Sequence, residues 1–138
     1  MPTRQRSFRL HSRTLELLDE HARDAGLSAN ALAQRLLDES LRVERHPLIG
    51  FREGGSGTRF PALVGHRLSV WDVMGTVWAE GGDVAAAARY LQLGEHETRA
   101  CIDYYADFKD EVDAYGAEQE AFAERVRQQL ERRRAVVG

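Results

Sequence analysis

The sequence predicts a mainly α-helical protein with a few short β-strands. Apolar residues recur every three or four positions over most of the 138 residues, which is the period of an amphipathic helix. Two stretches are typical of strands instead: residues 4–10 alternate, and residues 48–64 form short apolar runs around a cluster of glycines. We therefore expect a strand and two helices over residues 1–46, a β-hairpin and three helices over 47–116, and one C-terminal helix over 117–138.

The first expected element is a basic strand, RQRSFRL, with one apolar side. Phe8 and Leu10 are separated by one residue, so both would point to the same face of a strand. The residues that alternate with them are polar, namely Ser7, Arg9 and His11. No acidic residue occurs in the first 15 positions. The alternative is a frayed basic tail, in which the alternation would be a coincidence.

Two amphipathic helices are expected after this strand. Ser12 can cap the first helix, and Gly26 fits the position just past its end. Its apolar face is Leu15, Leu18, Ala22 and Ala25. Ser28 is the expected cap of the second helix, which should end near Arg45 because His46-Pro47 follows. The apolar face of this second helix is Leu32, Leu36, Leu37 and Leu41.

A single strand with two helices cannot fold alone. The strand would leave its backbone hydrogen bonds unsatisfied, and about 45 residues bury too little surface. The simplest partner is the same strand of a second copy, which gives a two-stranded antiparallel ribbon over four helices. We therefore expect a homodimer or a higher homo-oligomer, with Phe8 and Leu10 in its core.

The middle part should begin with a β-hairpin. Its strands are expected at Ile49–Arg52 and Arg59–Val64, and Gly65-His66 should form a tight turn after them. The flexible tip between the strands is Gly54, Gly55, Ser56 and Gly57.

Three helices should follow this hairpin and end before residue 117. The first should bury Val70, Val73, Met74, Val77 and Trp78 and end at Gly81-Gly82. The second should be capped by Asp83 and bury Val84, Ala87, Ala88 and Leu91. The third should open at Gly94-Glu95 and contain Ala100, Cys101, Tyr104, Tyr105 and Phe108.

The C-terminal helix, Ala117–Arg134, has little apolar surface of its own. Its apolar residues are Ala121, Phe122, Val126 and Leu130. A helix this polar is not stabilised by its own packing. We therefore expect it to pack against a partner or to fray.

Composition and charge limit the classes of function. The net charge of −3 excludes a uniformly basic nucleic-acid binder, but the charge is unevenly distributed. Residues 1–46 hold eight arginines against seven acidic residues, whereas residues 47–116 hold six basic against eleven acidic residues. Cys101 is the single cysteine, so neither an intramolecular disulfide nor a cysteine-based zinc site is expected. No apolar run approaches the ~18 residues of a membrane span, and we expect a cytoplasmic protein without a membrane partner.

The expected ribbon is suited to the major groove of DNA, where outward side chains of a two-stranded ribbon reach base edges. Arg9 can bind guanine with two hydrogen bonds, and Ser7 and His11 suit less demanding contacts. The start of the second helix at Ser28 offers backbone N–H groups to a phosphate. Further phosphate contacts are expected from Arg4, Arg6 and Arg13.

A resemblance to the ribbon-helix-helix fold of bacterial repressors and antitoxins is carried by residues 9–41, RLHSRTLELLDEHARDAGLSANALAQRLLDESL. The matching features are the end of the strand, the leucine spacing of both helices and the turn at Gly26-Leu27-Ser28. In that family three alternating strand residues read DNA, and these correspond here to Ser7, Arg9 and His11. His11-Ser12 departs from the proline that often starts the first helix.

The middle part resembles a small domain found in VapB-type antitoxins, which are often encoded beside a toxin of the PIN or PIN-like ribonuclease class. The likeness runs through RFPALVGHRLSVWDVM and VAAAARYLQLGEHETRACIDYYADFKDEVDAY. Together the two resemblances imply an antitoxin of a type II toxin–antitoxin system that represses its own operon by binding operator DNA. They imply toxin contacts at Trp71, Tyr104 and Tyr105.

The C-terminal helix adds candidate toxin contacts of its own. PIN-type ribonucleases bind metal with clustered carboxylates, which arginine can neutralise by bidentate pairing. The candidates are Phe122, Arg125, Arg127, Arg132, Arg133 and Arg134. The alternative is a solvated helix end favoured by its dipole.

Three rival interpretations remain for the middle part and the whole chain. Residues 84–105 have the pattern of a DNA-binding helix-turn-helix, but the acidic residues Glu95, Glu97 and Asp103 would face phosphates. The acidic cluster Asp103, Asp107, Asp110, Glu111 and Asp113 has the residue type of a Mg²⁺ site, but no nucleophile or histidine completes it. We therefore expect no enzyme activity and no cofactor. The alternative function is a stand-alone ribbon-helix-helix regulator whose C-terminal domain binds a partner or a signal.

Overall fold

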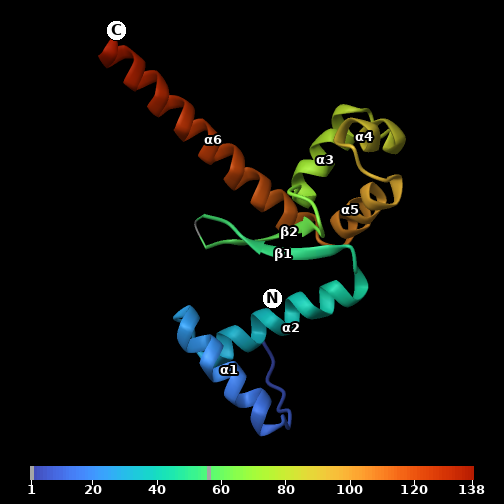
Figure 1. The fold of residues 1–138 in the computed structure, drawn as a ribbon, viewed down its shortest axis with the longest axis vertical. Coiled ribbons are helices and arrows are strands. Elements are labelled where there is room, and N and C mark those ends of the chain that lie inside the picture. The colour runs from blue at the N-terminus through green and yellow to red at the C-terminus, as the bar shows by residue number, and fades with distance from the viewer. Residues whose placement is uncertain (1, 56) are drawn as a thin grey trace. The chain divides into compact units, whose positions relative to one another are not determined.

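The computed structural model describes residues 2–55 and 57–138, and helices account for most of them (Figure 1). Within this part of the chain there are six helices and one two-stranded antiparallel sheet, which confirms the mainly α prediction with short strands. The chain divides into two compact units, Met1–Arg42 and Val43–Gly138, which we call unit 1 and unit 2.

Unit 1 contains helix α1 (Ser12–Ala25) and most of helix α2 (Ala29–Arg45). Gly26 ends α1 in the left-handed conformation, with a φ of 69°, where its N–H bonds back to the last turn. The expected cap at Ser12 is wrong, because Ser12 is already helical and His11 occupies the capping position without a side-chain hydrogen bond. Ser28 does cap α2, since its Oγ accepts a hydrogen bond of 3.0 Å from the N–H of Ala31.

The expected strand over residues 4–10 is not formed in the single chain. Residues 2–11 have no regular secondary structure. A strand is defined by hydrogen bonds to a neighbour, and the neighbour expected here belongs to a second copy of the chain. The ribbon therefore remains a prediction.

Unit 2 begins with the expected hairpin. Strand β1 (Ile49–Glu53) pairs antiparallel with β2 (Arg59–Leu63), and the register joins Ile49 to Leu63 and Glu53 to Arg59. Both strands lie within one residue of the predicted bounds. Of the predicted tip, Ser56 lies outside the described residues.

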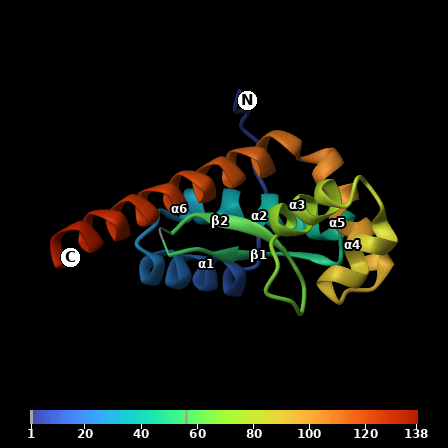
Figure 2. The ribbon, with the colours of Figure 1, turned by 90° about the horizontal axis from the view of Figure 1, so that it is seen from above.

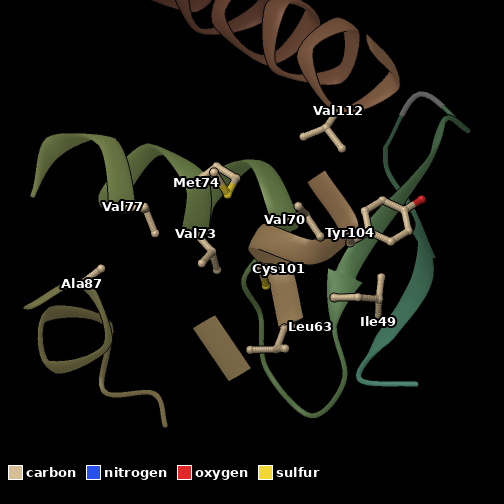
Figure 3. Packing of buried hydrophobic residues seen from close by; sticks show 10 residues of the cluster. All are labelled: Ile49, Leu63, Val70, Val73, Met74, Val77, Ala87, Cys101, Tyr104 and Val112. Carbon is tan, nitrogen blue, oxygen red and sulfur yellow. The ribbon is translucent and has the colours of Figure 1, made fainter. Parts of the chain in front are cut away.

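Helix α3 (Val70–Ala79) supplies the centre of the unit 2 core. Its start is fixed by a capping box, in which Ser69 and Asp72 exchange side-chain and backbone hydrogen bonds of 3.1 and 2.9 Å. Figure 3 shows its side chains meeting those of the hairpin and of the later helices. The buried residues of this core are Ile49, Leu63, Val70, Val73, Met74, Val77, Ala87, Cys101, Tyr104 and Val112.

One predicted core residue of α3 lies elsewhere. Trp78 is 47% exposed, although the sequence pattern places it on the buried face. Val77 is the last buried residue of that face, and Trp78 lies about 100° further round the helix. It therefore falls at the edge of the buried face, on the side of Trp71.

Helices α4 (Val84–Leu91) and α5 (Glu95–Asp107) form the predicted pair. Asp83 caps α4 as expected, with its Oδ1 accepting from the N–H of Ala86 at 3.0 Å. Gln92 ends α4 in the left-handed conformation, with a φ of 58°. Glu97 closes the first turn of α5 by accepting from the N–H of Gly94 at 3.0 Å.

The last helix, α6 (Lys109–Val137), is 29 residues long and begins eight residues before the predicted start at Ala117. Phe108 was expected inside the preceding helix, but its φ of −130° breaks the helical path between α5 and α6. Val112 and Gly116 are the buried residues of α6. From residue 117 onwards all side chains are exposed except the half-buried Glu124, and the C-terminal end points away from α4 and α5 (Figure 2).

No helix among the described residues combines the length and the apolar character of a membrane-crossing segment.

Candidate nucleic-acid interface and protein-binding surface

The basic residues predicted to contact DNA are all at the surface of unit 1. Every described residue from 2 to 11 is exposed, and this set includes Arg4, Arg6, Ser7, Arg9 and His11. Arg13 lies in the first turn of α1, where its guanidinium is 3.5 Å from the carboxylate of Glu16. Both partners of this ion pair are more than 60% exposed, so water screens it and it holds Arg13 only weakly.

The start of α2 presents backbone N–H groups in a fixed direction. The Ser28 hydroxyl occupies one of them by accepting from Ala31. The other N–H groups of a first helical turn have no acceptor within the helix, so the helix dipole and these donors favour an anion at this end. This is the geometry expected of a phosphate contact at Ser28.

Unit 1 also exposes an apolar surface that is large for its size. Ala22 and Leu32 are its buried apolar residues among those described. Phe8 and Leu10, which were predicted to enter a dimer core, are 65% and 49% exposed. The two helices and the turn between them expose large apolar side chains as well, namely Leu15, Leu17, Leu27, Leu36, Leu37 and Leu41. So many exposed large apolar side chains on a small unit favour an interaction site.

Sequence reasoning missed Arg35, which lies on α2 in unit 1. Its Nε is buried and has no hydrogen-bond partner within the described part of the chain. A buried guanidinium N–H without an acceptor costs free energy, so native structures rarely leave one. The spacing of apolar residues along α2 did not indicate that Arg35 is buried, because an arginine beside a leucine face is ordinarily exposed to water.

In unit 2, three aromatic side chains form a row along α3 and α5. The ring centroids of Trp71 and Trp78 are 5.6 Å apart, and those of Trp78 and Tyr105 are 5.4 Å apart, both in edge-to-face geometry. The Tyr105 hydroxyl donates to Asp113 at 2.8 Å. Burial, together with the neighbouring Asp113 carboxylate, raises the pKa of Tyr105.

The predicted toxin contacts in unit 2 therefore differ in accessibility. Trp71 and Tyr105 are half-buried and belong to the aromatic row. Tyr104 is 1% exposed and packs in the core against Phe108, so its ring has almost no surface to offer a partner. Trp78 joins the accessible set, and the seven-residue spacing of the two tryptophans is the signal that could have found it.

An open groove of about 760 Å³ lies between the hairpin tip and α6. Gly55 and Thr58 line its hairpin side, and Phe122 and Arg125 line its helical side together with neighbouring residues of α6. Two predicted toxin contacts, Phe122 and Arg125, therefore share one surface. The other predicted contacts on α6 are exposed as well: Arg127, which pairs with Glu124, and the arginines 132, 133 and 134 near the C-terminal end.

Two residues of the predicted acidic cluster, Asp107 and Asp113, have polar partners within unit 2. Asp107 is 2.7 Å from the Nε2 of His46 and 3.1 Å from the Nε of Arg45. Asp113 is 2.8 Å from the Nζ of Lys109. Among the described residues, no group of three or more histidine, cysteine or carboxylate side chains is arranged to hold a metal ion.

The helix pair α4–α5 carries an acidic end. Glu95 and Asp103 are exposed, and Glu95 pairs with Arg99 at 2.8 Å. Glu97 is half-buried and contacts the Nε2 of His66 at 2.7 Å. The hydrogen bond from the Gly94 N–H, and then that from His66, holds the pKa of Glu97 below its usual range. A carboxylate anchored in this way repels phosphates, so the pair is poorly suited to DNA.

No protein-family model, curated protein or solved structure matches the chain when it is compared with each of these.

Proposed function

We propose that the chain is the antitoxin of a type II toxin–antitoxin system. Residues 1–46 dimerise and bind operator DNA, and residues 47–138 neutralise a PIN-like ribonuclease. The observation that carries this proposal is the uncovered apolar surface of unit 1, which adjoins an exposed and strongly basic segment. Both features are accounted for by one event, the pairing of two copies.

Dimerisation is supported by the burial in unit 1. A unit of 42 residues that buries only Ala22 and Leu32 among its described apolar residues is too small to be stable by itself. A second copy brings the same apolar side chains to the same surface, as a two-fold interface requires. It also supplies strand-to-strand hydrogen bonds to residues 4–10.

DNA binding then follows from the alternation along the strand. If Phe8 and Leu10 face the dimer core, Ser7, Arg9 and His11 face away from it together. Two antiparallel strands present two such sets side by side, at the width that the major groove accepts. Arg4, Arg6 and Arg13 lie beyond these residues, where they can contact phosphates.

Toxin neutralisation is supported by the resemblance to VapB-type antitoxins and by the exposed surfaces of unit 2. Trp71 and Tyr105 belong to the half-accessible aromatic row, and Phe122 and Arg125 line the groove beside α6, which supports a role for these four residues in partner binding. The arginine-rich end of α6 carries the charge that pairs with a carboxylate cluster. We assign Tyr104 to the core and replace it with Trp78 in the proposed surface.

The dimer is tested with two substitutions of the same chemistry on opposite sides of the strand. Phe8→Glu should convert the dimer to a poorly folded monomer and abolish DNA binding, because it places a charge in the apolar interface. Ser7→Glu should keep the dimer and lose only DNA binding. Sedimentation equilibrium and a DNA mobility-shift assay distinguish these outcomes. A well-folded monomer of the unmodified chain would refute the proposal.

Base reading is tested by comparing Arg9 with Arg4. Arg9→Ala should weaken binding to the operator by about 1–3 kcal/mol and change binding to random DNA little. Arg4→Ala should weaken binding to both DNAs alike and reduce the salt dependence. Equal effects of both variants on both DNAs would show that Arg9 contacts only phosphate.

The toxin partner is tested by co-expression with the product of the neighbouring gene. A PIN-like protein should co-purify with the tagged chain, and the triple change of Arg132, Arg133 and Arg134 to Ala should weaken inhibition of its ribonuclease activity. Loss of a buried arginine–carboxylate contact at an interface costs roughly 2–5 kcal/mol. If no PIN-like gene adjoins this one, the stand-alone regulator is the better interpretation.

A further inference from the structure

Gly75 occupies an exposed position in the middle of α3, where the fold does not require a glycine. Glycine is less favourable than alanine inside a helix. A Cβ at Gly75 would meet no described atom within 4 Å, whereas at Gly116 the ring of Trp71 leaves no room for a Cβ. A local preference that is broken without a packing reason is expected at a functional position.

Two tryptophans flank Gly75 on the same side of α3. Trp71 precedes it by four residues and Trp78 follows it by three, which are the spacings of neighbours on one helix face. The two indole rings are in edge-to-face contact, and Trp78 is 47% exposed. The missing side chain therefore leaves open space beside two partly exposed rings. We call this space, bounded by Trp71, Gly75 and Trp78, the Gly75 gap.

We propose that the Gly75 gap receives an apolar side chain from a helix of the protein partner. When two helices pack, a side chain of one inserts among residues i, i+3, i+4 and i+7 of the other. On α3 these positions are Trp71, Met74, Gly75 and Trp78. Large rings at both ends and no side chain at Gly75 suit a bulky aliphatic residue. This inference deepens the proposed function and rests on it, because the partner is the PIN-like ribonuclease.

Other occupants fit the Gly75 gap less well. A two-fold contact centred here would place glycine against glycine, so a second copy would leave the gap empty. Nucleic acid is disfavoured by charge, because α3 and its C-cap carry Asp72 and Glu80 and no basic residue. Both carboxylates are on exposed residues, so they favour basic residues beside the inserted side chain of the partner.

A size series at position 75 of the full chain tests this inference. Gly75→Ala and Gly75→Leu should fold at least as well as the unmodified chain, because both residues favour a helix over glycine at this exposed site. Thermal unfolding checks this. Affinity for the purified PIN-like product of the neighbouring gene should fall about threefold for Gly75→Ala and about tenfold or more for Gly75→Leu, since each added group overfills the gap. Titration calorimetry measures both.

Two further variants complete the experiment. Tyr90→Leu is the control, because Tyr90 is 74% exposed on α4 outside the aromatic row, and its affinity should not change. Trp78→Ala should weaken binding about tenfold or more. Unchanged affinity of Gly75→Leu would overturn the inference, and a weaker Trp78→Ala in the same series would leave the proposed function standing. If the PIN-like protein does not bind the unmodified chain, the proposed function is refuted and this inference with it.

Discussion

Substitution of two helical glycines of unit 2 can measure how tightly α6 packs against α3. Gly116 of α6 lies against Trp71, and a Cβ at this position would be less than 3.0 Å from the ring atoms Cδ2, Cε2 and Cε3. Gly75 of α3 is also helical, and a Cβ there meets nothing within 4 Å. The same change to alanine should therefore have opposite effects at the two sites.

The expected magnitudes follow from two terms. Alanine favours a helix over glycine by about 0.8–1.0 kcal/mol, so Gly75→Ala should stabilise unit 2 by about that amount. Gly116→Ala gains the same term but must displace a packed indole, and such overpacking typically costs about 1–3 kcal/mol. The difference between the two variants isolates the contact of Gly116 with Trp71. At roughly 4–8 °C per kcal/mol for a domain of this size, thermal unfolding resolves it.

Tryptophan fluorescence is the appropriate assay. Both tryptophans of the chain, Trp71 and Trp78, lie in unit 2, so the signal reports this unit alone. A double change, Gly116→Ala with Trp71→Leu, should show a favourable coupling, because the smaller side chain leaves room for the added methyl group. If Gly116→Ala raises the melting temperature as much as Gly75→Ala does, α6 does not pack on Trp71 and the reasoning fails.

Two further predictions concern titratable groups of unit 2. Burial, followed by the nearby Glu97 carboxylate, raises the pKa of Cys101 to about 12; the native chain should therefore resist Ellman's reagent, and rapid labelling at neutral pH without denaturant would contradict its burial. The pKa of Glu97 is lowered from its ordinary value of 4.5 by the Gly94 N–H and by His66. Its contribution to stability is therefore present above about pH 4.5 and lost as the pH falls through the lower folded value. Urea unfolding between pH 6 and 3 should show a shallower acid loss for Glu97→Gln, and identical profiles would show that Glu97 adds no such contribution.

Local signals in the sequence predicted much of the secondary structure. Gly26, Ser28 and Asp83 mark helix ends in the structure as they do in the sequence, because capping depends on neighbours within four residues. The two strands of the hairpin were predicted from two short apolar runs around glycines. These features need no knowledge of the rest of the chain.

Elements that depend on distant contacts were harder to predict. Phe108 continues the apolar period of α5, yet it leaves the helix because its ring packs 4.8 Å from that of Tyr104 and 6.0 Å from that of His46. The hydrogen bond between His46 and Asp107 joins residues 61 positions apart. No local pattern signals such contacts.

The candidate site residues could also be predicted only in part. Exposure of the basic residues 4–13 and of the arginines on α6 follows from their polarity. The burial of Tyr104 and the exposure of Trp78 depend on which side of each helix meets the core. The sequence does not decide this for Tyr104, because Tyr105 beside it is equally apolar in pattern. The expected strand over residues 4–10 stays a prediction, because a strand is defined by hydrogen bonds to a neighbour and the single chain supplies none there.

The isolation of α6 beyond Gly116 has a consequence for how this protein can change over generations. Residues in a core constrain one another, so a new side chain there usually lowers stability and is removed by selection. Among positions 117–138 only Glu124 is half-buried, so replacements there should change the fold of unit 2 little. This part of the helix can therefore accept new side chains by ordinary drift, whereas substitutions in the core of unit 2 are constrained by their neighbours.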